Sequence, residues 1–227
     1  MLALAFGGQH RSLKSVLCLG SHCDDIEIGC GGTIIRLTEE YPEASFHWVV
    51  FSSDQTRADE ARRSADRFLK KIVPKSVVIK DFRGSFFQFI GAEIKEYFEQ
   101  LKGEVSPDVI FTHYGKDLHQ DHRLISELTW NSFRNHLILE YEIPKYDGDF
   151  GSPNVFVHLD KSVCKRKLHT ILNIFRTQKD KQWFSRELFL SVLRVRGMES
   201  NAPSTYAEAF YCRKLILGLG LRSGGDR

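Results

Sequence analysis

The strongest constraint on the fold is an alternation of short apolar segments with longer amphipathic ones. The segment 15–20 is continuously apolar, as in a strand that is buried on both faces of a sheet. The segment 57–71 is rich in charge and places its apolar residues on one helical face. The sequence predicts strands at 15–20, 46–52, 76–79, 108–112, 155–159 and within 206–216, and helices at 34–40, 57–71, 89–101, 122–136, 161–176 and 184–196.

Strands that alternate with helices through the first half of the chain predict an α/β fold. Such a fold has a mainly parallel sheet with helices on both of its faces. The length of 227 residues suits one domain rather than two, and no repeat or linker-like segment interrupts the chain. We therefore expect a single domain over residues 1–227, with loosely ordered ends at 1–14 and 217–227.

The composition argues against several kinds of partner and setting. The net charge of +3 is small, so charge gives no reason to expect a nucleic acid as partner. No stretch approaches about 18 consecutive apolar residues, so we expect no membrane span. The five cysteines form no Cys-x-x-Cys pair, and the first residues do not resemble a signal peptide. A cytoplasmic protein with free thiols is the simplest expectation.

Two clusters of acidic and histidine side chains follow predicted strands. The first begins at His22, directly after the segment 15–20, and the second begins at His113, after the segment 108–112. In open parallel sheets, ligands bind outside the carboxyl ends of the strands. Either cluster alone is compatible with an ordinary polar turn, because aspartate is common in turns. Two clusters at one edge of a sheet indicate a functional site, since converging titratable groups are costly without a role.

The first cluster has the residue types of a hydrolytic metal site. A catalytic zinc site needs three nitrogen or oxygen ligands and an open position for water. His22 and Asp25 are three residues apart in a tight turn and can reach one ion. Asp24 is adjacent to Asp25, so its side chain points elsewhere and can serve as a free proton acceptor.

The second cluster can supply the third ligand. His119 and His122 are three residues apart, and Asp121 lies between them. One histidine can complete a His–Asp–His site, while the other faces the substrate with a carboxylate that holds its ring and raises its pKa. A protonated imidazole in that place would stabilise the oxyanion of a tetrahedral intermediate.

The glycine-rich segment 29–33 could be mistaken for a phosphate-binding loop. It lacks both a Gly-x-Gly-x-x-Gly pattern directly after the first strand and a Gly-Lys-Ser/Thr ending. We expect it to serve a close strand-to-helix crossing, where glycine lets two backbones approach.

Both clusters lie in stretches that match a family pattern. Residues 21–33 read Ser-His-Cys-Asp-Asp-Ile-Glu-Ile-Gly-Cys-Gly-Gly-Thr, and residues 119–122 read His-Gln-Asp-His. They resemble the two motifs of the LmbE/PIG-L family of zinc-dependent N-deacetylases, Ala-His-Pro-Asp-Asp-x-Glu-x-Gly-Cys-Gly-Gly-Thr and His-x-Asp-His. Further similarity lies at 57–60, 196–197 and 206–210, so the resemblance covers most of the chain.

The resemblance implies a Rossmann-like, LmbE-like α/β fold and a Zn²⁺ site, with Fe²⁺ or Co²⁺ as other metals that such ligands accept. It also implies a role for each matching residue. The implied roles are metal ligands for His22, Asp25 and His122, general base for Asp24, oxyanion stabilisation for His119, orienting carboxylate for Asp121 and substrate contact for Arg57.

The expected reaction removes an acetyl group from an N-acetylated amino sugar of the N-acetylglucosamine type. The substrate would be a small-molecule sugar conjugate, and the products would be acetate and a free amine. Two alternatives stay open, a hydrolase of a non-sugar amide that uses the same zinc site and a non-catalytic sugar-binding module. The sequence also leaves open which sugar is bound and whether the chain forms a homo-oligomer.

Two departures from the family pattern concern the site. Cys23 stands where the family has proline, so the turn loses a fixed φ, and its thiol could compete as a soft metal ligand. After the third strand, the family's acidic position falls on Gly84 or is shifted to Asp81. That region shapes the sugar pocket, so this departure bears on substrate identity.

Overall fold

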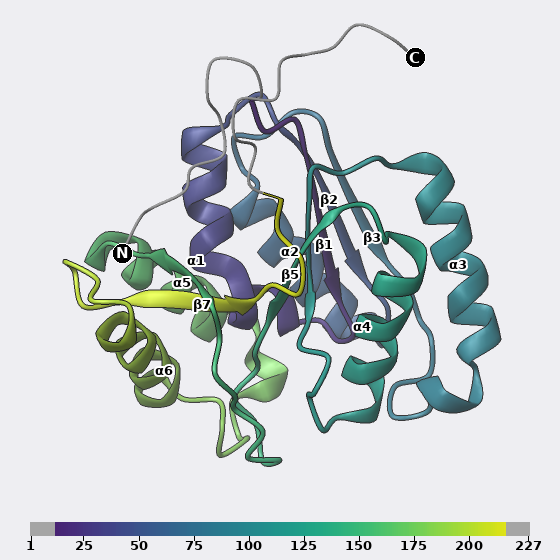
Figure 1. Ribbon diagram of the computed structural model, residues 1–227. Coiled ribbons are helices and arrows are strands. Elements are labelled where there is room, and N and C mark those ends of the chain that lie inside the picture. Colours follow the sequence, from purple (N-terminus) through teal and green to yellow (C-terminus); the bar gives the residue numbers. More distant parts are fainter. Residues whose placement is uncertain (1–11, 217–227) are drawn as a thin grey trace, which may run out of the picture.

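Residues 12–216 fold into a seven-stranded sheet with helices on both faces (Figure 1). The computed structural model describes residues 12–216. The strands are β1 (Ser15–Gly20), β2 (Ser45–Val50), β3 (Lys75–Ile79), β4 (Val109–His113), β5 (Leu137–Tyr141), β6 (Val155–His158) and β7 (Ala207–Tyr211). The helices are α1 (Asp25–Glu40), α2 (Gln55–Phe68), α3 (Gly91–Glu104), α4 (Gln120–Ser132), α5 (Lys161–Ile174) and α6 (Arg186–Glu199), with short 3-10 helices η1 (Phe87–Phe89) and η2 (Arg176–Gln178).

The sheet is mainly parallel, as predicted. Its strand order is β3-β2-β1-β4-β5-β7-β6. The first five strands in this order run parallel, whereas β7 is antiparallel to β5 and β6 is antiparallel to β7. Val16 of β1 pairs with Phe46 on one side and with Val109 on the other. The strand β1 is therefore internal to the sheet, which explains its continuous apolar sequence.

Each face of the sheet has its own apolar core. Side chains alternate along β1, so that Val16 and Cys18 pack on the face covered by α1, α2, α5 and α6. Leu17 and Leu19 pack on the opposite face, which α3 and α4 cover. The prediction of helices on both faces is thus confirmed. No helix within residues 12–216 is long and apolar enough to cross a membrane.

The start of α1 differs from the prediction. This helix begins at Asp25 rather than near residue 34, so the glycine-rich segment 29–33 lies inside it. The expected close approach of a helix and a strand is found at Gly29. A Cβ atom at Gly29 would lie 2.2 Å from the ring of Tyr141 on β5. Glycine is needed because the helix lies directly against the neighbouring strand.

A second difference concerns the residues after α4. The helix predicted at 122–136 ends at Ser132, and the next residues form β5, which was not predicted. The apolar residues Leu137 to Leu139 follow the helix after only a short turn. A short apolar segment in that place cannot be told from a buried helical turn by periodicity alone.

A third difference concerns the amino-terminal end. Residues 12–14 were predicted to be loosely ordered, but Leu13 is buried and the Lys14 amide donates a hydrogen bond to Asp108 (2.7 Å). The rest of the predicted loose ends, 1–11 and 217–227, lies outside the described residues.

The order of the strands places the two clusters together. The strands β1 and β4 are neighbours, yet the helices that follow them, α1 and α4, lie on opposite faces. Because the chain leaves the two strands in opposite directions, a crevice opens at their carboxyl ends. His22 directly follows β1, and His122 lies in the first turn of α4. The crevice therefore holds both clusters.

Candidate active site

The three predicted ligands bring their donor atoms together at the crevice. His22 Nδ1 lies 3.4 Å from Asp25 Oδ2, and His122 Nε2 lies 3.3 Å from His22 Nδ1 and 3.5 Å from Asp25 Oδ2. Tetrahedral ligands at about 2.0–2.1 Å from a zinc ion are themselves roughly 3.3–3.4 Å apart. The spacing of the three atoms therefore fits one face of a tetrahedral site.

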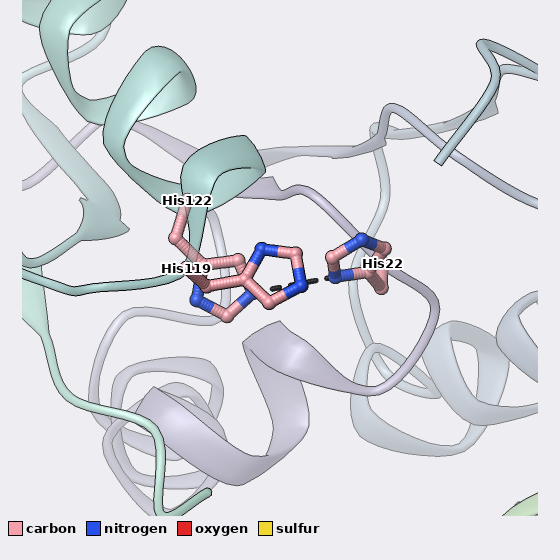
Figure 2. Close-up of side chains that lie close together, drawn as sticks. All are labelled: His22, His119 and His122. Carbon is pink, nitrogen blue, oxygen red and sulfur yellow. Dashed lines mark hydrogen bonds between the residues drawn. The ribbon is translucent and has the colours of Figure 1, made fainter. Parts of the chain in front are cut away.

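His22 and His122 each have a second ring nitrogen, which does not face the other ligands. In both residues this nitrogen lies within hydrogen-bond distance of a carboxylate. Asp121 Oδ2 lies 3.1 Å from His22 Nε2, and Asp117 Oδ2 lies 2.9 Å from His122 Nδ1. Metal-binding histidines usually donate their second N–H in this way, which fixes the tautomer. These contacts leave His22 Nδ1 and His122 Nε2 facing each other (Figure 2). Both nitrogens also face the carboxylate of Asp25.

Such an arrangement attracts positive charge. Burial by itself would lower the pKa of His22, but the charges of Asp25 and Asp121 outweigh it and raise this pKa to about 10. Three lone pairs directed at one point repel each other unless a proton or a metal ion lies between them. The donor set of two imidazoles and one carboxylate is the set that divalent zinc accepts.

The structure contradicts the predicted partner of Asp121. Its carboxylate holds His22 and accepts hydrogen bonds from the backbone amides of Ser85 (2.6 Å) and Phe87 (3.3 Å), and it does not hold the ring of His119. Backbone donors from the loop after β3 decide the orientation of this carboxylate. The predicted pair of Asp121 with a charged His119 is therefore wrong.

His119 instead caps the amino-terminal end of α4. Its Nδ1 accepts a hydrogen bond from the Asp121 amide (3.2 Å), so the neutral ring carries its proton on Nε2. Burial and the charge of His22 lower the pKa of His119, which opposes the predicted rise. The ring centroid lies 4.4 Å from that of His122 and 5.0 Å from that of His22 (Figure 2). A neutral N–H donor thus stands beside the three predicted ligands.

The two carboxylate oxygens of Asp24 differ in their hydrogen bonding. Arg57 Nη2, from the first turn of α2, donates to Asp24 Oδ1 at 3.0 Å. The other oxygen, Oδ2, is buried and has no hydrogen-bond partner among the described residues. Burial raises the pKa of Asp24, and the charge of Arg57 opposes this rise. Arg57 therefore positions Asp24, while its predicted contact with substrate stays a prediction.

Two residues of the second cluster had been given no role. His113, the last residue of β4, is buried with Nε2 at 2.9 Å from the Ser21 amide and 3.3 Å from Asp25 Oδ2. With Asp25 and His122 it forms one of two groups of side chains whose ligand atoms lie within 4.8 Å of one another, and the other group is His22, His119 and His122. Asp117 holds His122, as described above. In the sequence, these two residues could have been identified as candidates because they follow a predicted buried strand and lie among other titratable residues.

Cys23 does not belong to the ligand set. Its Sγ lies 3.1 Å from Ser53 Oγ and 3.5 Å from the Ser52 carbonyl oxygen, in the loop after β2. Burial raises the pKa of this thiol to about 12, and neither group of potential metal ligands among the described residues includes Cys23. The alternative in which Cys23 competes as a soft ligand is therefore not supported.

We expect the variant Cys23→Pro to keep its bound metal. None of the hydrogen bonds among residues 12–216 uses the Cys23 amide as donor, so proline would remove no backbone interaction there. Elemental analysis of the purified variant and of the parent measures the result, with Asp25→Ala as the control that should lose metal. Metal loss in Cys23→Pro would identify the thiol as a ligand.

Comparisons with known proteins find a family, a relative and solved structures that are similar to this chain. The model of the PIG-L family, described as GlcNAc-PI de-N-acetylase, matches residues 17–133, which include all the predicted site residues. A relative from Escherichia coli (strain K12), named uncharacterized deacetylase YaiS, is 28% identical over 168 residues, which cover 68% of this chain and 87% of the relative.

Two solved structures illustrate how far the fold is shared. The N,N'-diacetylchitobiose deacetylase from Pyrococcus horikoshii has a TM-score of 0.65 at 20% identity and covers 88% of this chain and 84% of its own. GalB, the 4-carboxy-2-hydroxymuconate hydratase from Pseudomonas putida KT2440, has a TM-score of 0.72 at 18% identity and covers 92% of this chain and 100% of its own. At these identities the likeness concerns the fold alone, and the same fold serves a deacetylase and a hydratase.

Proposed function

The chain belongs to the PIG-L family of de-N-acetylases, and we propose from this premise that it is a metal-dependent hydrolase of N-acetylated amino sugars. The substrate would be a small-molecule conjugate of the N-acetylglucosamine type, and the products would be acetate and the free amine. The single observation that carries the metal dependence is the meeting of His22 Nδ1, Asp25 Oδ2 and His122 Nε2 within 3.5 Å of one another.

The metal-site residues would be His22, Asp25 and His122. A divalent metal held there supplies a Lewis acid that lowers the pKa of water toward neutrality and polarises a carbonyl group. Zinc fits the donor set, and Fe²⁺ or Co²⁺ would also be accepted by two imidazoles and a carboxylate.

Asp24 would act as the general base. Its free Oδ2 can take the proton of the attacking water, while Arg57 keeps Oδ1 in place. The water oxygen adds to the acetamide carbon, the C–N bond then breaks, and the proton held by Asp24 passes to the leaving amine. One water is consumed, and one acetate and one amine result.

His119 would stabilise the carbonyl oxygen as it gains negative charge. Its Nδ1 is engaged with the Asp121 amide, so Nε2–H is the donor that remains for this purpose. A neutral donor makes a weak interaction with an uncharged acetamide and a stronger one with the oxyanion. This proposal replaces the charged imidazole that the sequence predicted.

We expect His119→Ala to lower kcat by roughly 10²–10³-fold, because it removes a donor that acts mainly in the transition state. KM and metal content should change little. His119→Asn is the matched control, since asparagine retains the capping of α4 but its shorter side chain lacks the Nε2–H. Steady-state acetate release and elemental analysis measure both variants. A normal kcat with a raised KM would make His119 a residue that positions the substrate.

The reaction itself can be tested with a panel of N-acetyl compounds. We expect acetate release from N-acetylglucosamine derivatives, little release from simple acylated amines, and none after chelation. Release from non-sugar amides alone would favour the alternative hydrolase. Binding of acetylated sugars without acetate release would favour a binding module, and it would overturn the proposed reaction.

We also propose a cytoplasmic setting, with no nucleic acid as partner. All five cysteines, Cys18, Cys23, Cys30, Cys164 and Cys212, are free, and the first four are buried. Free thiols are typical of a reducing compartment.

A further inference from the structure

Three helices enclose a cavity at the end of the molecule away from the candidate active site. The helices α1, α2 and α5 contact one another on one face of the sheet, and a cavity of about 270 Å³ lies between them. Thr38, which lines the cavity, is near the end of α1, whereas Asp25 is the first residue of this helix. At a rise of about 1.5 Å per residue, the two are roughly 20 Å apart. The cavity is therefore separate from the crevice.

The opening of the cavity is positively charged. Five basic residues line it, and all of them are exposed: Arg67, Lys70, Lys71, Arg166 and His169. Among the described residues that line the cavity, Glu39 is the one carboxylate, and it already pairs with Arg166 at 2.7 Å. No carboxylate within residues 12–216 pairs with Arg67, Lys70 or Lys71, in contrast to the nearby Lys75, which pairs with Asp66. The cavity thus has three cations without a partner.

Neutral hydrogen-bond donors also line the cavity. Thr170 on α5 is only 9% exposed, and no hydrogen bond in the described part of the chain engages its hydroxyl group. A buried polar group without a partner is uncommon and calls for an explanation. His169 Nδ1 lies 3.2 Å from Asn173 Nδ2, which can only donate, so the neutral ring carries its proton on Nε2. Both side chains can therefore donate to a ligand.

This set of groups suits a phosphate group. A phosphate monoester carries a charge of about −1.5 to −2 at neutral pH and presents three strong acceptor oxygens. The planar guanidinium of Arg67 can bind two of these oxygens, while Lys70 and Lys71 neutralise the remaining charge. A carboxylate, with one charge, would leave most of the positive charge uncompensated.

The size and the apolar part of the cavity limit the rest of the ligand. Its volume is just below the range of roughly 300–1,000 Å³ that is usual for ligand pockets, so the ligand is a small molecule. The buried side chains of Ile35 and Phe68 line the cavity and can contact the carbon atoms that carry the phosphate.

We propose that this cavity is a second binding site, which takes a small molecule that carries a phosphate group. The phosphate would lie among Arg67, Lys70 and Lys71, with the hydroxyl group of Thr170 and the ring of His169 as further donors. A soluble phosphate ester and the headgroup of a lipid share this chemistry. The inference does not rest on the proposed function, because no residue of the cavity belongs to the metal site.

The ligand class can be tested with glycerol 3-phosphate, with glycerol as the control that lacks the phosphate. In calorimetry of the purified protein at about 0.15 M salt, we expect saturable binding of glycerol 3-phosphate and none of glycerol. Sedimentation with phosphatidylcholine vesicles that contain phosphatidic acid forms the lipid arm. Binding to these vesicles alone would assign a headgroup, and binding of glycerol 3-phosphate alone would assign a soluble ester. Absence of binding in both arms would overturn the proposal.

Two cavity variants and two matched controls locate the binding. Arg67→Ala and Lys71→Ala should each weaken it by about two- to tenfold, which is the usual effect of losing one hydrogen-bonding partner. Arg63→Ala removes the same charge one turn earlier on α2, and Lys165→Ala removes one on α5. Both control residues are exposed and lie outside the cavity, so these variants should keep the parent dissociation constant.

Two results would contradict the location. An equal loss of affinity in cavity variants and controls would show that the ligand is attracted by surface charge in general. An unchanged affinity in all four variants would place the phosphate elsewhere, for example at the metal site. Either result would overturn the proposal.

Thr170→Val distinguishes a specific site from general attraction between charges. Valine has nearly the same shape as threonine but lacks the hydroxyl group, so we expect binding to weaken by about two- to tenfold with no change in net charge. Urea unfolding should show that stability is retained, because the hydroxyl group makes no hydrogen bond in the described part of the chain. Full affinity in Thr170→Val would contradict the proposed site. Phosphate binding that depends on Arg67, Lys71 and Thr170 would support it even in a protein that releases no acetate.

Discussion

Asp24→Asn should lower kcat by roughly 10²–10⁴-fold, which is the usual contribution of a positioned general base. Asparagine has nearly the same shape, and its amide oxygen can still accept the hydrogen bond that Arg57 Nη2 donates to Asp24 Oδ1. The amide nitrogen that replaces the free Oδ2 cannot take a proton from water. Acetate release under saturating substrate measures the loss, and elemental analysis should find the metal retained.

The neighbouring carboxylate provides the matched control for this prediction. Asp25 Oδ2 lies within 3.5 Å of the facing nitrogens of His22 and His122, so Asp25→Asn should weaken metal binding itself. The two adjacent variants should then differ in metal content, although both should have a lower rate of acetate release than the parent. Turnover at the parent rate in Asp24→Asn would show that another group takes the proton.

The second large effect concerns stability. Lys167→Met should lower the free energy of unfolding by about 3–5 kcal/mol, because it leaves the charge of Glu208 buried without its partner. Lys167 Nζ lies 2.6 Å from Glu208 Oε1 and 2.7 Å from the Ile28 carbonyl oxygen, and both charged side chains are almost fully buried. Glu208 also accepts hydrogen bonds from the amides of Gly32 and Thr33 in α1.

Urea unfolding of the variant and of its parent measures this difference. Lys165→Met is the control on the same helix, since Lys165 is exposed and its replacement should change stability by less than about 0.5 kcal/mol. A loss below about 1 kcal/mol for Lys167→Met would show that Glu208 is compensated in another way. The pair matters for the site because α1, to which it is attached, begins with Asp25.

The parallel part of the sheet could be predicted because the apolar residues follow a different pattern in its strands than in its helices. The segment at β1 is apolar without a break, while α2 has apolar residues only on the face toward the core. The strand β5 could not be found in this way, because Leu137 follows α4 too closely for a change of period to be seen. The start of α1 was missed since three glycines lower helical propensity. Only tertiary contacts explain them, because Gly29, Gly31 and Gly32 lie close to the side chains of Tyr141, Phe68 and Leu159, respectively.

The arrangement of site residues could be predicted where the local sequence or the order of the strands determines their positions. His22 and Asp25 share one turn, and the order of β1 and β4 brings His122 to them. The partner of Asp121 was not predictable, because the amide of Ser85, from a distant loop, fixes its orientation. The charge of His119 was missed for the same reason, since its ring caps α4 instead of pairing with a carboxylate.

The most direct test of metal-dependent deacetylation is a titration of metal-stripped protein with Zn²⁺, in which acetate release from an N-acetylglucosamine conjugate is followed. One site formed by His22, Asp25 and His122 predicts that the rate rises in proportion to added metal and levels off at about one equivalent per chain. Full acetate release from the metal-stripped protein, unchanged by added metal, would contradict the account.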